Sequence, residues 1–183
     1  PPLAELEPGA LFVPGVLART SRRATLPGRW AARLAAGLRR LAQRPGIAWE
    51  GAYAGSIIML ILESGLFAGW DVRVFGNDIS RRVLQVARTG LYGRTSFRQT
   101  DEKYVRRYFK EVEGRYQIRD EVKAMASFGM VNLMDESQLA IVGEVDVILC
   151  RNVLIYFDLA SRKKAVTHFY RKLVKGGYLL LGH

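Results

Sequence analysis

The sequence is poor in several residues that define common protein classes. Its 183 residues include one cysteine and two histidines. A single cysteine excludes a scaffold held by disulfides and a cysteine-rich zinc site. The longest uninterrupted apolar run, residues 57–62, is far shorter than the roughly 20 residues that cross a bilayer, and no secretory signal is visible. These absences favour a soluble protein, which we expect to be cytoplasmic.

The charge balance is the one extreme value of the composition. Lysine and arginine total 28, against 17 aspartates and glutamates, which gives a formal net charge of +11. This excess favours an acidic partner, and charge alone leaves nucleic acid, a membrane surface and an acidic protein surface open. Since 49% of the residues are hydrophobic, the chain can build a substantial core, which argues against wholesale disorder.

The composition divides the chain near residue 50. Residues 1–50 contain eight arginines, three glutamates and all six prolines, but neither lysine nor aspartate. We predict loop or poor order for residues 1–27 and one amphipathic basic helix at residues 28–44. Its apolar stripe consists of Trp30, Leu34, Leu38 and Leu41. Such a helix fits a domain edge, a lipid surface or part of a transit-like peptide.

Residues 51–183 are predicted to form one domain of alternating strands and helices. Strands are predicted at residues 71–75, 115–118, 122–128, 145–150 and 178–181. Helices are predicted at residues 56–63, with Ser56 as the cap, and at residues 80–88, 104–110 and 159–174. The nearly continuous apolar character of residues 145–150 is typical of a central strand covered on both faces. This order predicts an α/β open sheet. The two ends of the chain suggest a fragment of a longer protein.

Polar residues follow the predicted strands. Asp78 comes after the first of them, residues 151–152 follow the apolar strand, and residues 132–133 lie between. Ligands of open α/β sheets bind at the carboxyl ends of the strands, where an acidic residue can accept two hydrogen bonds from a ribose diol. Alternatively, Asp78 acts with Asn77 and Ser80 to cap the next helix. Both interpretations stay open on sequence geometry alone.

Five ordered segments resemble one protein family. They are residues 77–80, 115–128, 131–133, 146–158 and 175–183, and the most specific stretch is Cys150-Arg-Asn-Val-Leu-Ile-Tyr-Phe-Asp158. Over residues 56–183 the chain resembles the CheR-type chemotaxis receptor methyltransferases. The resemblance implies a Rossmann-like methyltransferase sheet, incomplete here at both ends, with S-adenosylmethionine as cofactor. It also implies methyl transfer to glutamate side chains on acidic helices of chemoreceptors, the methyl-accepting proteins.

The resemblance implies a role for each residue of the candidate site, which consists of Asp78, Asn132, Leu133, Arg151, Asn152 and Tyr156. Asp78 would hold the ribose of the cofactor, and Asn132 and Leu133 would line the adenine site. Arg151 and Asn152 would lie near the methionine end. Tyr156 would lie beside the sulfonium methyl group and orient the acceptor, which makes it the candidate catalytic residue.

The glycine-rich cofactor loop of the family is altered in this sequence. Residues 46–56 occupy its position, but Ala52 and Tyr53 replace the two glutamates of the family pattern, and no apolar strand precedes them. A second hypothesis is therefore a non-catalytic homologue, a regulatory or interaction module. A reading-frame error in residues 1–55 would explain the same departures. A third hypothesis, a nucleic-acid-binding methyltransferase, depends on charge alone.

The remaining reactive residues have ordinary structural explanations. His168 and His183 lie far apart without acidic or cysteine partners at ligand spacing, so no metal site is predicted. Cys150 lies in a predicted buried strand, where we expect a core residue rather than a nucleophile. Five basic residues are candidates for attracting an acidic acceptor, although solvated surface charge is the favoured interpretation for any single one of them. They are Arg81, Arg82, Arg106, Arg107 and Lys110.

Overall fold

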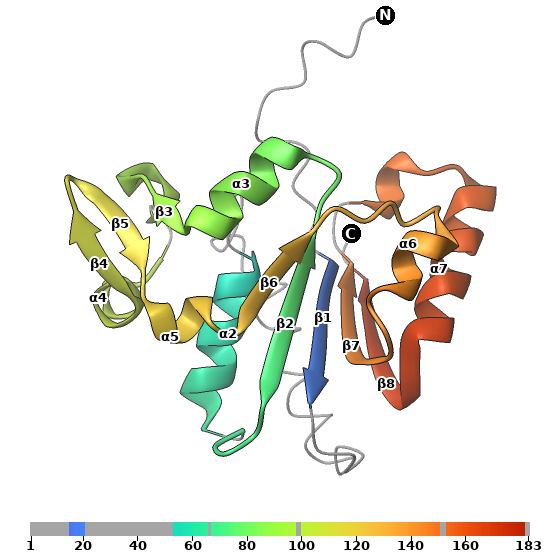
Figure 1. Ribbon diagram of the computed structural model, residues 1–183, viewed down its shortest axis with the longest axis horizontal. Coiled ribbons are helices and arrows are strands. Elements are labelled where there is room, and N and C mark those ends of the chain that lie inside the picture. The colour runs from blue at the N-terminus through green and yellow to red at the C-terminus, as the bar shows by residue number, and fades with distance from the viewer. Residues whose placement is uncertain (1–14, 21–52, 66, 98–99, 151–152, 182–183) are drawn as a thin grey trace, which may run out of the picture.

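The fold is that of a computed structural model, which describes residues 15–20, 53–65, 67–97, 100–150 and 153–181 (Figure 1). Two sheets organise this part of the chain, one with five strands and one with three. The predicted helix at residues 28–44 lies outside the described residues. The five-stranded sheet positions the candidate site.

The larger sheet has the strand order β6-β2-β1-β7-β8. Its members are β1 (Gly15–Thr20), β2 (Val72–Asn77), β6 (Ala126–Gly129), β7 (Val145–Cys150) and β8 (Leu173–Leu181). β6 pairs in parallel with β2, and β8 with β7, whereas β1 lies antiparallel between β2 and β7. Because β1 opposes both of its neighbours, the four other strands point one way. Their carboxyl ends therefore share one edge of the sheet.

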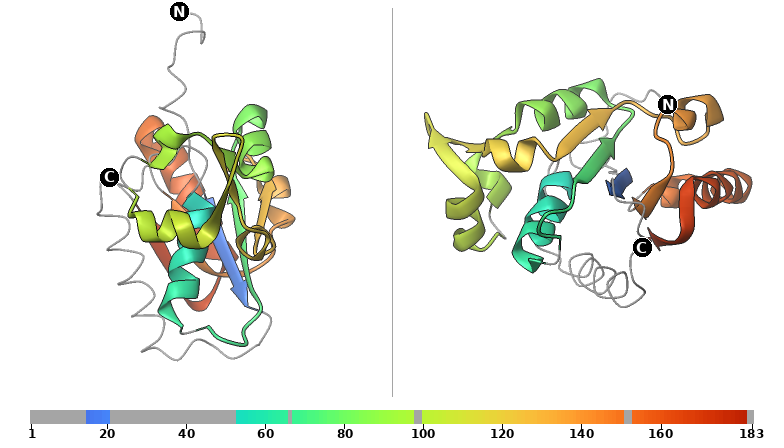
Figure 2. Two further views of the ribbon diagram at one scale, coloured as in Figure 1. Left: turned by 90° about the vertical axis from the view of Figure 1, so that its left-hand side faces the viewer. Right: turned by 60° about the horizontal axis from the view of Figure 1, so that its bottom comes forward.

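Alternate residues of β7 belong to hydrophobic clusters on opposite faces of the sheet, since successive side chains of a strand point to opposite sides. Val147 and Leu149 join a cluster that includes residues of α2 (Tyr53–Ser64). Ile148 and Cys150 join another with Phe169 of α7 (Leu159–Lys172). Figure 2 shows α2 and α3 (Arg81–Thr89) on opposite sides of the sheet. β7 is thus covered on both faces, as predicted.

The smaller sheet is inserted in the chain between β2 and β6 and has the order β3-β5-β4. This unit consists of β3 (Leu91–Tyr92), η1 (Arg94–Phe97), α4 (Glu102–Tyr108), β4 (Phe109–Val112), β5 (Arg115–Ile118) and α5 (Asp120–Lys123). Tyr92, Phe97 and Phe109 make edge-to-face ring contacts in its core. The Tyr108 hydroxyl donates a 2.6 Å hydrogen bond to the Glu63 carboxylate of α2, which joins this unit to the larger sheet's helix layer.

Several predicted elements are confirmed. β5 and β7 have the predicted bounds, and α7 begins at the predicted residue. α3 begins after Ser80, whose Oγ accepts a 3.4 Å hydrogen bond from the Val83 N–H. It ends at Gly90, whose φ of 67° is the left-handed conformation in which helices commonly terminate. Local sequence signals therefore predict these elements well.

Two predictions are wrong where pairing between strands decides the structure. Loop was predicted for residues 1–27, but β1 occupies the centre of the larger sheet at Gly15–Thr20. Helix was predicted for residues 104–110, but α4 ends at Tyr108, and Phe109 is extended and pairs with Ile118. β1 pairs with strands far away in sequence, and β4 pairs with β5 as a hairpin; the periodicity of a single segment reveals neither pairing.

Two further predictions are wrong in their details. Residues 122–128 were predicted as one strand, but α5 includes Val122 and ends at Lys123, and β6 begins at Ala126. Val122 is fully buried on this single helical turn, so its apolar character reports burial rather than an extended backbone. Ser56 does not cap α2, because that helix already begins at Tyr53.

Candidate active site

A pocket opens at the carboxyl edge of the larger sheet, where the segments after β2, β6 and β7 meet. The last residues of β2 and β6 are direct partners, Asn77 with Gly129. The pocket has a volume of about 320 Å³ and is lined by Asn77, Asp78, Ile79, Val131, Asn132, Leu133, Met134, Val153, Tyr156 and Phe157. Its size lies within the range of small-molecule sites. This is the strand edge at which open α/β sheets bind ligands.

The pocket brings together four of the six residues singled out from the sequence. Asp78, Asn132, Leu133 and Tyr156 all line it, although they come from three segments far apart in the chain. Arg151 and Asn152 lie outside the described residues. Five apolar wall residues were not singled out: Ile79, Val131, Met134, Val153 and Phe157. Their only sequence signal was their position inside or beside the matching segments.

Asp78 is a buried carboxylate on the pocket wall, with 4% of its surface exposed. Its Oδ1 accepts a 2.6 Å hydrogen bond from the Ser80 N–H, so it helps to form the turn into α3. A carboxylate offers about four lone-pair sites, so this bond is compatible with a further contact to a ligand. The capping and binding interpretations of Asp78 are therefore compatible with each other.

The segment between β6 and α6 (Glu136–Ala140) forms a second wall of the pocket. The Asn132 Oδ1 accepts a 2.9 Å hydrogen bond from the Met134 N–H, and the Asn132 N–H donates a 2.9 Å bond to the Gln138 Oε1. The Met134 N–H can only donate, so the Asn132 atom that it contacts is the amide oxygen. The amide NH₂ of Asn132 is then the group that can donate a hydrogen bond to a ligand. The Leu133 carbonyl accepts a hydrogen bond from His168 Nδ1 at 2.9 Å.

Tyr156 stands at the mouth of the pocket, on the short helix η2 (Leu154–Tyr156). It is 60% exposed, so it can meet a ligand in the pocket and a partner outside it. The chain that follows Tyr156 is fixed at the start of α7 by Asp158, whose Oδ1 accepts a 2.7 Å hydrogen bond from the Ser161 N–H. This backbone bond lowers the pKa of Asp158, because it favours the ionised carboxylate.

Cys150, at the end of β7, is buried rather than presented to a ligand, as predicted. Burial raises the pKa of its thiol to about 12. The thiolate is the reactive form of cysteine, so this residue is a poor nucleophile at neutral pH. The residue acts as part of the core beside Ile148.

We therefore expect native Cys150 to resist alkylation. At pH 8 its reaction with iodoacetamide should be more than about 100-fold slower than in the urea-unfolded chain, because burial withholds both the thiolate and access. The folded pKa lies above the unfolded value, so the folded state holds this proton more tightly. Its contribution to stability is complete below about pH 9 and is lost as the pH rises towards 12. Similar alkylation rates in the two states would contradict the buried position.

Two of the five basic candidates have ion-pair partners. Arg106 pairs with Glu102 at 2.7 Å, and Arg107 pairs with Glu63 at 3.0 Å. Both arginines belong to α4, in the unit built on the smaller sheet. Arg81 and Arg82 instead begin α3, close in sequence to the pocket residue Ile79. Of the five basic candidates, these two are the closest in sequence to a pocket residue.

Comparison with known families decides the affiliation of the chain. Residues 49–183, well over half of it, match the SAM-binding domain of CheR methyltransferases. This chain belongs to the CheR methyltransferase family. The cofactor of the matched domain is S-adenosylmethionine, and the incomplete Rossmann-like α/β fold agrees with the match.

Curated relatives of this CheR family member include several chemotaxis enzymes. The chain is 35% identical over 135 residues to chemotaxis protein methyltransferase 2 of Vibrio cholerae, covering 70% of the chain and 45% of that protein. It is 36% identical to a chemotaxis protein methyltransferase of Vibrio parahaemolyticus, covering 76% and 54%. It is also 36% identical to the probable biofilm formation methyltransferase WspC of Pseudomonas aeruginosa, covering 69% and 30%. The chain thus spans about half or less of these relatives' length.

The described residues offer neither a metal site nor a membrane span. Within the ranges given above, no group of three or more histidine, cysteine, aspartate and glutamate side chains is arranged to hold a metal ion. Within the same ranges, none of the helices has the length and apolar character needed to cross a bilayer.

Proposed function

We propose that residues 51–183 form a methyltransferase domain that transfers a methyl group from S-adenosylmethionine to glutamate side chains of chemoreceptor-type proteins. The observation that carries this proposal is the buried Asp78 carboxylate in a pocket at the carboxyl edge of the sheet, in a chain of the CheR family. The chemotaxis methyltransferases among the relatives support the choice of acceptor.

The pocket has the features that an adenosyl group requires. A nucleoside needs hydrogen-bonding groups for its ribose and its base, and an apolar wall on which the base can lie. Asp78 provides an acceptor for the ribose hydroxyls, and the Asn132 amide provides a donor for the base. Leu133, Val131 and Met134 add apolar surface beside Asn132. We assign the ribose to Asp78 and the adenine to Asn132 and Leu133.

The remaining residues of the site are assigned by the chemistry at the sulfonium. When bound, S-adenosylmethionine supplies an electrophilic methyl group whose bond to sulfur breaks as an acceptor oxygen attacks, and the bonding pair returns to sulfur. A glutamate carboxylate is ionised at neutral pH and is its own nucleophile, so the chain needs no general base for it. Tyr156 at the pocket mouth orients the acceptor, and Arg151 and Asn152 hold the methionine end. Alignment of the two reactants is then the main source of rate.

The acceptor is expected to be an acidic helix. The net charge of +11 draws an acidic partner towards the chain, and Arg81 and Arg82 lie on the α3 end next to the pocket residue Ile79. The exposed Tyr156 ring offers apolar contact at the same mouth. An amphipathic helix that carries glutamates matches both features.

Methyl transfer is tested with radiolabelled S-adenosylmethionine and the cytoplasmic helical fragment of a chemoreceptor. Glutamyl methyl esters are labile to base, so mild alkali should release the incorporated label as volatile methanol. A fragment with its acceptor glutamates changed to alanine is the matched control and should take up no label. Absence of label on the intact fragment, under conditions in which the chain is folded, would contradict the proposed activity.

A second candidate function is a non-catalytic module that keeps the family fold. The family pattern has two glutamates where this chain has Ala52 and, at the start of α2, Tyr53. Those glutamate carboxylates would bind a positively charged group, so their absence from this chain favours the second candidate. Calorimetric titration with S-adenosylhomocysteine, together with the methyl-transfer assay, distinguishes the two candidates. Weak or absent binding by a folded chain that transfers no methyl group favours the module, and binding together with transfer favours the enzyme.

A further inference from the structure

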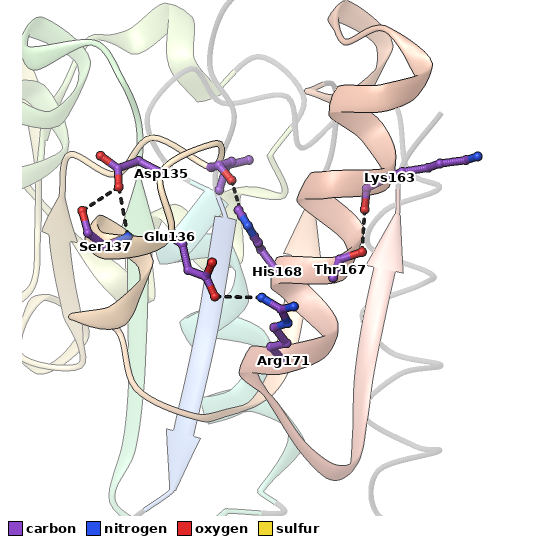
Figure 3. Close-up of polar contacts among 8 residues, drawn as sticks. Asp135, Glu136, Ser137, Lys163, Thr167, His168 and Arg171 are labelled. Carbon is purple, nitrogen blue, oxygen red and sulfur yellow. Dashed lines mark hydrogen bonds and ion pairs between the residues drawn. The ribbon is translucent and has the colours of Figure 1, made fainter.

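The fold contains a buried histidine that contacts the pocket wall from behind. His168 lies on α7 with 5% of its surface exposed, and its Nδ1 is 2.9 Å from the carbonyl oxygen of Leu133. Leu133 itself lines the candidate cofactor pocket, together with its neighbours Asn132 and Met134. Figure 3 shows His168 pointing from α7 towards the segment that precedes Asp135.

The direction of this hydrogen bond follows from its partners. A backbone carbonyl can only accept, so Nδ1 of His168 carries the hydrogen and donates it. The bond connects residues 35 positions apart in the chain. Because the Leu133 carbonyl is part of the backbone, the bond restrains the main chain of the pocket wall rather than a side chain that can rotate away.

Other polar contacts of α7 are exposed to solvent or stay within the helix. Arg171 pairs with Glu136 of α6 at 2.8 Å, but the two side chains are 59% and 66% exposed, so water and salt weaken the pair. The Thr167 hydroxyl donates to the Lys163 carbonyl of its own helix and makes no such link to the wall. Figure 3 shows all three contacts. Arg162 of α7 also donates to a pocket residue, the Phe157 carbonyl at 2.8 Å, but that bond is exposed, whereas the His168 side chain is buried.

The opposite side of the same segment is held by the sheet. The Asn77 Nδ2 donates to the Val131 carbonyl at 3.5 Å, and the Asp78 N–H donates to the Gly129 carbonyl at 3.4 Å. The segment that carries Asn132 is therefore fixed between β2 on one side and α7 on the other. Sites whose supporting groups are fixed in this way keep their ligand contacts in register.

We propose that His168 is a positioning residue, which holds the backbone of residues 132–134 in the geometry that receives the adenosyl group of the cofactor. This inference rests on the proposed function, because it takes the pocket to be the cofactor site. It adds a residue of α7 that lines no part of the pocket and acts only through the Leu133 carbonyl.

The test compares two substitutions of the same residue. His168→Asn places an amide N–H close to the original Nδ1, so it can keep the bond to Leu133. His168→Leu has similar bulk but no donor, and it leaves the Leu133 carbonyl without this partner. Calorimetric titration with S-adenosylhomocysteine, at a temperature where each variant is folded, should show about a tenfold loss of affinity for His168→Leu. His168→Asn should stay within about threefold of the original chain.

Two measurements separate positioning from a purely structural role. A residue that only stabilises the fold would lower the melting temperature in His168→Leu and leave the affinity of the folded protein unchanged. Thr167→Ala is the matched control, because it removes a hydrogen bond that stays within α7, and its affinity should not change. In the methyl-transfer assay, His168→Leu should raise KM for S-adenosylmethionine more than it lowers kcat.

A spectroscopic measurement keeps the proposal testable if His168→Leu does not fold. The chain has two histidines, so the imidazole nitrogen signals of His168 are assigned in ¹⁵N NMR by comparison with a His183→Gln variant. Addition of S-adenosylhomocysteine should shift the Nδ1 signal of His168. Binding without such a shift, or equal affinity of the folded His168→Leu variant, overturns the inference alone. Absence of any binding by the original chain overturns the proposed function, and this inference with it.

Discussion

Replacing Asp78 with asparagine is expected to weaken the binding of S-adenosylmethionine by about 10- to 150-fold. A hydrogen bond to a charged group contributes about 1.5–3 kcal/mol, which corresponds to a factor in that range. Asparagine has nearly the shape of aspartate, and its Oδ1 can still accept the bond from the Ser80 N–H. The substitution therefore removes the charge and one acceptor, while the turn into α3 is retained.

Isothermal titration calorimetry of the folded variant measures this loss directly. Asp101→Asn is a matched control, because the Asp101 Oδ1 accepts a 3.0 Å bond from the N–H of Lys103, two residues on, as Asp78 does for Ser80. Asp101 precedes α4 in the smaller unit and does not line the pocket. Affinity should be unchanged in the control. Unchanged affinity in Asp78→Asn as well would show that Asp78 serves only the helix turn.

The convergence of the candidate site is predictable from sequence because parallel strands share an edge. Asp78, Asn132 and Tyr156 are separated by 54 and 24 positions, yet each follows a strand or lies shortly after one. Once the strands are known to be parallel, the segments after them must lie at one edge. The motif around Cys150 adds specificity, because it includes both the buried strand and the residues that follow it.

The parts that sequence does not reveal depend on contacts between distant segments. Nothing in the local pattern of residues 15–20 distinguishes a loop from a strand, and their place between β2 and β7 follows from backbone pairing alone. His168 has an equally uninformative context, because a histidine on a helix carries no signal for a bond to a carbonyl 35 residues away. Such features are revealed only by the three-dimensional structure. The bond from His168 supports the wall of the candidate site.

Replacing Phe169 with alanine is expected to destabilise the fold more than any other substitution considered above. Phe169 lies buried on α7, next in sequence to His168, and packs in a cluster with Ile148 and Cys150 of β7. It also borders a small apolar cavity of about 20 Å³ that Leu133 lines as well. Truncation of a buried phenylalanine costs about 3–5 kcal/mol, because transfer energy is lost and a cavity remains.

Thermal or urea unfolding measures this loss. The expected cost is a large share of the roughly 5–15 kcal/mol that holds a typical domain folded, and it should lower the melting temperature by roughly 6–20 °C. Tyr170→Ala is the matched control, since this neighbouring aromatic residue is 79% exposed and its loss should change stability by less than about 0.5 kcal/mol. A loss below about 1 kcal/mol in Phe169→Ala would contradict the packing of α7 on β7.

Ligand binding should restore part of the stability that Phe169→Ala loses. A ligand that binds only the folded state stabilises it by about 2.7 kcal/mol at 100 times its dissociation constant. Saturating S-adenosylhomocysteine should therefore offset half or more of the expected loss, provided that the pocket of the variant keeps its affinity. Because the enlarged cavity adjoins Leu133, a smaller rescue than in the original chain would show that packing beneath α7 also controls the pocket wall. Melting curves of both proteins with and without this ligand thus link the core of the domain to its cofactor site.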